Sequence, residues 1–70
     1  MDEKLRVDLY LFRARHFKSR NKAAQAVREG RIIQEGKILR SSSEVGAGDL
    51  LRIREKGLYR DIRILSLIHI

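Results

Sequence analysis

Apolar side chains between residues 6 and 17 recur at intervals of three and four, which places them on one face of an α-helix. This stripe consists of Val7, Tyr10, Leu11, Ala14 and Phe17. Asp8 can cap the start of the helix, which we expect to run from about Asp8 to His16. The stripe also predicts that Tyr10 and Phe17 pack in the core, whereas Phe12 lies off it.

A second helix is predicted after a short break at Phe17 and Lys18. Ser19 is a suitable N-cap, because its hydroxyl can accept a hydrogen bond from an amide of the first turn. Gly30 can end the helix in the left-handed conformation. The buried stripe of this helix is expected to be Ala23, Ala26 and Val27. Its small alanines would let the two short helices pack closely.

The second half of the chain predicts short β-strands joined by turns. The expected strands are Arg31–Ile33, Ile38–Leu39, Leu51–Arg54 and Tyr59 to about Ile68. Turns are expected at residues 34–37, 46–49 and 56–57, and residues 41–43 form an irregular polar stretch anchored by Val45. The alternation slips after Ile64, which a bulge or the burial of both faces would explain.

The order of these elements predicts the α+β class, with two N-terminal helices packed on a small, mainly antiparallel sheet of short strands. The chain has no Pro, no internal repeat and no low-complexity tract, so residues 1–70 are expected to form a single domain. A hydrophobic fraction of 43% suffices for a compact core but not for a deep cavity. An elaborate active site is therefore not expected.

The charge of the chain points to a polyanionic partner. Sixteen Lys and Arg against nine Asp and Glu give a formal net charge of +7 and a pI of about 10.6, which is typical of nucleic-acid binders. A merely soluble basic surface is the alternative. No apolar run approaches the roughly 20 residues of a membrane span, and the N-terminus lacks the apolar core of a signal peptide. We therefore expect no membrane partner, and the lack of Cys fits a cytoplasmic protein.

Catalytic and metal chemistry have no support in the sequence. Without Cys there is no disulfide or thiolate metal site, and His16 and His69 lie too far apart to suggest zinc. Asp8, Asp49 and Asp61 are isolated from one another. There is no Gly-rich phosphate loop and no nucleophile with a partner. The sequence thus predicts a non-enzymatic protein that needs no cofactor, metal or small-molecule substrate.

One ordered set of residues resembles a known family, the S4 RNA-binding domain. The set comprises Arg6-Val7-Asp8-Leu9-Tyr10-Leu11, Arg15, Lys18-Ser19-Arg20, Ala23, Gly30, Gly36, Val45 and Gly48-Asp49. The resemblance covers about residues 6–54 and is greatest to small, nearly free-standing S4 proteins of the heat-shock-protein-15 type. It implies an S4-like fold with the αL motif and binding to ribosomal RNA. Three positions depart from the family. Leu9 stands where the family often has a basic residue, Glu35 where it usually has Asn or Asp, and Ser41 where Pro is common.

The predicted RNA-binding residues fall in two regions. The basic side chains and the helix cap at and near the helix joint are Arg6, Arg13, Arg15, Lys18, Ser19, Arg20 and Lys22. Guanidinium and ammonium groups presented together bind phosphates, and amides at a helix N-terminus favour an anion. Arg6 could instead pair with Asp2 or Asp8. The family resemblance adds the loop after the first hairpin, with Lys37, Arg40 and Ser42.

Three readings of function remain open at this point. The first is binding of structured RNA by a monomer, with a role in ribosome function or translation quality control. The second is a targeting or interaction module of a larger RNA-modifying enzyme, such as a pseudouridine synthase. The third is helix-turn-helix-like DNA binding, which the two short helices suggest. Arg52, Arg54, Arg60 and Arg63 are expected to form a solvated sheet face and not a direct RNA contact.

Overall fold

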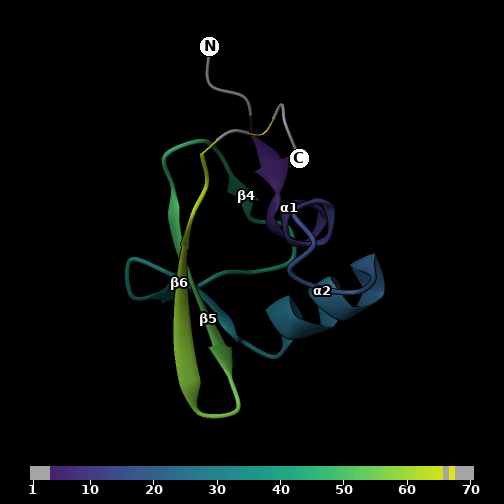
Figure 1. Cartoon of the computed structure of the whole chain (residues 1–70), viewed down its shortest axis with the longest axis vertical. Coiled ribbons are helices and arrows are strands. Elements are labelled where there is room, and N and C mark those ends of the chain that lie inside the picture. Colours follow the sequence, from purple (N-terminus) through teal and green to yellow (C-terminus); the bar gives the residue numbers. More distant parts are fainter. Residues whose placement is uncertain (1–3, 66, 68–70) are drawn as a thin grey trace.

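Two short helices lie on one side of a four-stranded antiparallel sheet in the computed structural model, which describes residues 4–65 and 67 (Figure 1). The helices are α1 (Val7–Arg13) and α2 (Arg20–Arg28). The strands are β1 (Leu5–Arg6), β2 (Ile32–Gln34), β3 (Lys37–Ile38), β4 (Glu44–Val45), β5 (Leu50–Glu55) and β6 (Leu58–Arg63). The α+β class and the two N-terminal helices on a small antiparallel sheet are confirmed.

The larger sheet has the strand order β3-β2-β5-β6, and every pairing in it is antiparallel. Two-residue turns close both hairpins, Glu35-Gly36 between β2 and β3 and Lys56-Gly57 between β5 and β6. All four turn residues have positive φ, between 48° and 81°. Such turns match the right-handed twist of the strands that they join, so the tight turns that the sequence predicts at both places are confirmed.

A second sheet of two strands, β1 and β4, was not predicted from the sequence. Leu5 pairs with Val45 and Arg6 with Glu44, and the Val7 amide donates to the Ser43 carbonyl at 2.9 Å. The chain therefore passes directly from β1 into α1. Strands of two residues are too short to show the alternation on which sequence patterns depend.

The bounds of α1 correct the sequence prediction at both ends. Arg6, and not Asp8, is the N-cap residue, and no side chain caps this helix. Asp8 instead lies buried in the first turn. Because β1 leads straight into the helix, there is no room for a separate capping residue. The helix ends at Arg13 and not at His16, since Arg15 adopts a left-handed conformation with φ 62°.

The last strand also ends earlier than predicted, at Arg63. Beyond it Ile64 is fully buried, while Leu65 is 83% exposed, so burial of both faces is not the reason for the slip in alternation. The slip coincides with the end of the strand. Part of the predicted extension, Ser66 and Ile68, lies outside the described residues, as does His69.

The core lies between the helices and the sheet. Its buried members are Val7, Tyr10, Leu11, Ala23, Ala26, Val27, Ile32, Val45, Leu51, Ile53 and Ile64. The helical stripes therefore face the sheet as predicted, with Tyr10 buried and Phe17 partly buried against the core. This packing leaves the joint between the helices, residues 14–19, at the edge of the core with its polar side chains outward.

Candidate nucleic-acid interface

The joint between α1 and α2 is shaped by a left-handed turn at Arg15. The Arg15 amide donates to the Phe12 carbonyl and the His16 amide to the Leu11 carbonyl, both at 2.9 Å. Together they form the Schellman motif that commonly ends a helix. The same motif ends α2, where Gly30 occupies the left-handed position. Arg15 thus stands where glycine is the usual residue, in a conformation that strains a side chain with a Cβ atom.

Ser19 caps the second helix, as the sequence predicts. Its hydroxyl accepts a hydrogen bond from the Lys22 amide at 3.1 Å, and its own backbone is extended. The first intrahelical hydrogen bond runs from the Ala23 amide to the Ser19 carbonyl. The amides of Arg20 and Asn21 precede this first donor and have no intrahelical acceptor, so this helix end can still bind an anion. Capping and anion binding are therefore compatible at this position.

The predicted cations at the joint are exposed, and three of them line one hollow. An open hollow there is lined by Phe12, Arg13, Arg15, His16, Phe17 and Lys18. Arg20 and Lys22 lie in the first turn of α2. Within the described part of the chain, Arg13, Arg15, Lys18, Arg20 and Lys22 form no ion pair. We call these five cations, with Ser19, the joint surface.

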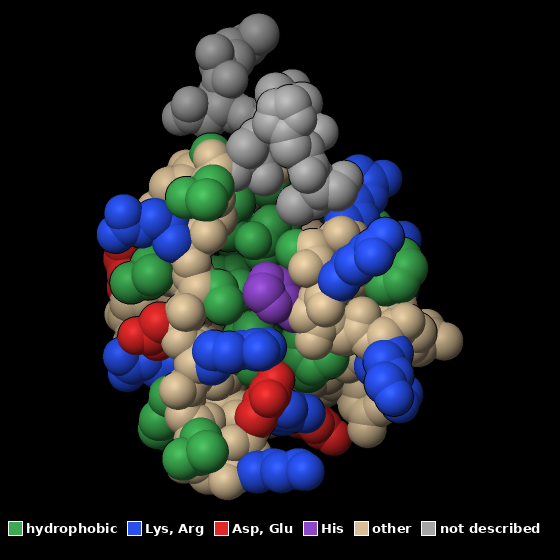
Figure 2. All heavy atoms as spheres, viewed as in Figure 1, with side chains coloured by type: hydrophobic (Ala, Val, Ile, Leu, Met, Phe, Trp, Pro, Cys, Tyr) green, Lys and Arg blue, Asp and Glu red, His purple; other side chains and the backbone are tan. Residues whose placement is uncertain are grey.

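In the space-filling view, Lys and Arg side chains over the helices have few acidic neighbours, whereas over the strands and at the lower end of the molecule they lie among acidic side chains (Figure 2). This agrees with the ion pairs of Arg52 and Arg60 in the strand half.

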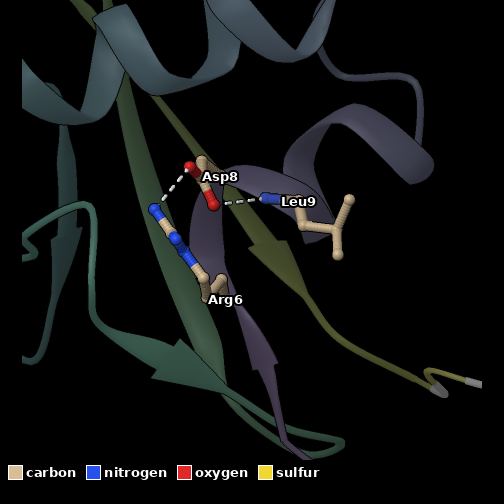
Figure 3. Close-up of polar contacts among 3 residues, drawn as sticks. All are labelled: Arg6, Asp8 and Leu9. Carbon is tan, nitrogen blue, oxygen red and sulfur yellow. Dashed lines mark hydrogen bonds and ion pairs between the residues drawn. The ribbon is translucent and has the colours of Figure 1, made fainter.

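Arg6 is held differently from the joint cations. Its Nη2 atom lies 3.2 Å from Oδ2 of Asp8, and Oδ1 of Asp8 accepts a hydrogen bond from the Leu9 amide at 2.7 Å (Figure 3). The Asp8 side chain is 4% exposed, while that of Arg6 is 50% exposed. Of the two partners that the sequence offered, Asp8 is the one used; Asp2 lies outside the described residues. Half of the Arg6 side chain remains open to solvent.

The predicted loop residues divide into two places. Arg40 and Ser42 lie in a turn that closes by hydrogen bonds between Arg40 and Ser43, and Ser43 in turn accepts from the start of α1. This turn therefore lies beside Arg6. Lys37 is on β3, an edge of the larger sheet. In the described chain no hydrogen bond or ion pair links either place to the joint surface.

Sequence reasoning did not assign Phe12 and His16 to the site, although both line the hollow. Phe12 is 39% exposed, and its place off the apolar stripe was the signal. Burial lowers the pKa of His16, the charge of Arg60 lowers it further, and Glu55 partly opposes this. The His16 ring lies 6.2 Å from that of Tyr10, and burial raises the pKa of Tyr10.

The arginines of the strand half are exposed, as predicted, but two of them are neutralised. Nε of Arg52 lies 2.8 Å from Oδ1 of Asp61, and Nη2 of Arg60 lies 3.4 Å from Oε1 of Glu55. The hydrogen bond from Arg52 lowers the pKa of Asp61; desolvation partly opposes this, and the charge of Arg52 lowers the pKa further. Arg31 pairs similarly with Glu29 at 3.6 Å. This half therefore offers fewer free cations than its composition suggests.

Comparisons with known proteins agree with this geometry. The S4 domain family model matches residues 5–51. A similar solved structure is the trimeric heat shock protein 15 of Vibrio cholerae, with a TM-score of 0.82 and 28% sequence identity over 93% of this chain and 66% of that one. The chain thus spans about two thirds of that protein. A search of curated proteins gives no significant match. None of the helices in the described residues is long and apolar enough to cross a membrane.

Proposed function

Because this chain belongs to the S4 domain family, we propose that its RNA-binding role is to recognise structured RNA, ribosomal RNA in particular, through the joint surface. The family match and the heat-shock-protein-15 fold support a general role in binding RNA. We also propose that the protein acts in the cytoplasm, in ribosome function or in translation quality control.

The observation that carries the proposal is the absence of acidic partners at the joint. Five cations surround one open hollow and the capped start of α2, and none of them forms an ion pair within the described residues. Each free cation can neutralise a phosphate and release its condensed counterion, which drives association. A positive surface that binds phosphates suits folded RNA, whose A-form major groove hides the base edges.

The loop turn with Arg40 and Ser42 supplies a second contact in this proposal. The turn lies against the start of α1 through the Ser43 carbonyl, next to the half-exposed guanidinium of Arg6. Lys37, on the outer strand β3, would reach a flanking phosphate. These contacts would fix the orientation of the RNA, whereas the joint surface supplies most of the affinity.

Fluorescence anisotropy with a structured ribosomal RNA fragment tests the proposal. Binding should weaken steeply between about 50 and 200 mM salt, because each phosphate contact contributes close to one unit to the logarithmic salt slope. Replacing Lys18 and Arg20 together by Gln should lower that slope by about 2. Affinity that ignores salt, or a double variant with an unchanged slope, would refute a phosphate-binding joint.

Competition experiments separate the other readings. A helix-turn-helix-like DNA binder would prefer duplex DNA to structured RNA in direct competition, and a targeting module would need the rest of an RNA-modifying enzyme to act. The V. cholerae protein is trimeric, whereas we expect a monomer here. Sedimentation at several protein concentrations, with and without RNA, measures which state binds.

A further inference from the structure

The hairpin β5–β6 has a second face, which points away from the helices. Leu51 and Ile53 of β5 are fully buried, so their neighbours along the strand point to the opposite side. Cross-strand pairs on that side are Leu50 with Arg63, Arg52 with Asp61 and Arg54 with Tyr59. We call these six residues the outer face.

The centre of the outer face is a group of three side chains in mutual contact, Arg52, Tyr59 and Asp61. The Arg52 guanidinium carbon lies 5.4 Å from the centroid of the Tyr59 ring, which is cation–π distance. Both Arg52 hydrogen bonds go to the Asp61 carboxylate, at 2.8 and 3.4 Å. The carboxylate therefore fixes the guanidinium against the ring. Tyr59 nevertheless remains 58% exposed, so much of this planar platform is open to a ligand.

A hollow lies over this platform. It is lined by Ile33, Glu35, Gly36, Leu50, Leu51, Arg52, Tyr59 and Asp61. Apolar side chains from β2 and β5 form one part of the lining, and the guanidinium and the phenol ring form another. The carboxylates of Asp61 and Glu35 are acceptors at its rim. A planar ring with apolar faces and N–H groups on its edge has the chemistry that such a hollow accepts.

Free positive charge flanks the hollow along the strands. Within the described chain, Arg54 and Arg63 form no ion pair. Arg54 is the cross-strand neighbour of Tyr59, and Arg63 lies four residues beyond Tyr59 on the same face of β6, a separation of roughly 14 Å. Two phosphates on either side of a bound base would meet these guanidinium groups.

We propose that the outer face is a second RNA contact, which holds an unpaired base on the Tyr59–Arg52 platform while Arg54 and Arg63 bind the adjacent phosphates. The inference rests on the proposed function, since it assigns a site for the single-stranded part of the same RNA. Stacking on an aromatic side chain accepts any base, so the outer face adds affinity for a single-stranded extension next to the helix that the joint surface binds.

The test compares two RNAs with the full chain: a blunt hairpin, and the same hairpin with a short single-stranded extension containing 2-aminopurine. The extension should raise the affinity of the natural protein about tenfold and quench the 2-aminopurine fluorescence by stacking. Tyr59→Ala should lose both effects and keep its affinity for the blunt hairpin. Tyr59→Phe should retain both. Leu58→Ala, at a residue 74% exposed on the opposite face of the same strand, is the matched control and should also retain both.

Each other result decides against the outer face. If Tyr59→Ala keeps the advantage of the extension, or the natural protein never shows it, the outer face is not an RNA contact although the joint surface still is. If neither RNA binds, the proposed function fails as well. If Tyr59→Ala instead reduces self-association in sedimentation and leaves both RNA affinities unchanged, the outer face is a protein contact.

Discussion

The joint surface and the β5–β6 hairpin are both rich in basic residues, but they differ in what those residues contact. The five cations of the joint form no ion pair within the described chain, whereas Arg52 and Arg60 of the hairpin each hold an acidic partner. The cations behind the net charge of +7 are therefore not equally free to bind an anion in the two regions. The net charge predicts that the protein binds a polyanion. Which cations lack an acidic partner predicts where the polyanion binds.

The origin of the difference lies in the periodicity of the two halves. In the hairpin, antiparallel register brings Asp61 opposite Arg52, and the tight turn brings Glu55 close to Arg60. Around the joint, the nearest acid of α1 is Asp8, which is buried and already bound to Arg6 and to a backbone amide. Helix α1 consequently keeps its acid inside and its cations outside.

The largest effect should come from neutralising the joint. Lys18→Gln with Arg20→Gln should weaken binding of the ribosomal RNA fragment by about 3 kcal/mol, or about 100-fold, because two charge-assisted phosphate contacts are lost. Fluorescence anisotropy at fixed salt measures this. Both side chains lie on the exposed surface, so thermal unfolding should stay unchanged.

The matched variant removes the same charge from paired arginines. Arg31→Gln with Arg60→Gln also lowers the net charge by two, but both residues already hold acidic partners, Glu29 and Glu55. We expect a change in RNA affinity of about twofold or less from the weaker overall field. Equal losses for the two double variants would show that net charge, and not pairing, decides affinity.

The next largest effect concerns the acids of the two halves. Asp8→Ala should reduce the free energy of unfolding by about 2 kcal/mol, because the partly buried Leu9 amide loses its acceptor and Arg6 loses its partner. Asp61→Ala removes an acid from the exposed pair with Arg52, whose side chain is 54% exposed, and should not measurably move the denaturant midpoint. Urea titrations of both variants compare them directly. A similar midpoint for both would mean that the burial of Asp8 contributes nothing.

Asp8 also shows where sequence reasoning reached its limit. Its place at the start of an apolar stripe suggested a helix cap, but next to the β1–β4 pairing the N-cap residue is Arg6, two residues before the predicted cap. That pairing joins residues about forty positions apart through strands of two residues, for which no local pattern exists. By contrast, Ser19, Gly30, Gly36 and the Lys56-Gly57 turn were predictable because each depends on local backbone chemistry.

For the candidate site, the sequence identified the cations but not their availability. The sequence placed Arg13, Arg15 and Lys18 at or near the helix joint, and the structure gathers them around one hollow. The pairing of Arg52 with Asp61 depends on strand register across the turn, which alternation alone does not define. The platform of the outer face could not be predicted for the same reason.

A smaller effect should follow from the left-handed position that ends each helix. Arg15→Gly should raise the free energy of unfolding by roughly 0.5–1 kcal/mol, because glycine adopts φ near 62° without strain. It should also weaken RNA binding several-fold by removing one phosphate contact. Gly30→Ala should lower the free energy of unfolding by about 1 kcal/mol, because alanine is strained at φ 75°. It should leave RNA affinity unchanged. If Arg15→Gly leaves stability and affinity unchanged, Arg15 is neither strained nor a contact.

The smallest effect should be the pH dependence contributed by His16, which lies between the two regions. Burial and the charge of Arg60 hold its pKa below the ordinary value of 6.5, so the folded protein binds this proton less readily than the unfolded chain. The stability that follows is fully present above about pH 6.5 and is lost as the pH falls toward the lower pKa of the folded state. Since the ring is partly exposed and screened by solvent, the loss should stay well under about 1 kcal/mol.

His16→Phe keeps an aromatic ring beside Tyr10 and removes the titration. Thermal unfolding at about pH 5.5 and about pH 7.5 should therefore show a smaller difference for the variant than for the natural protein. An equal difference would mean that folding does not lower the pKa of His16.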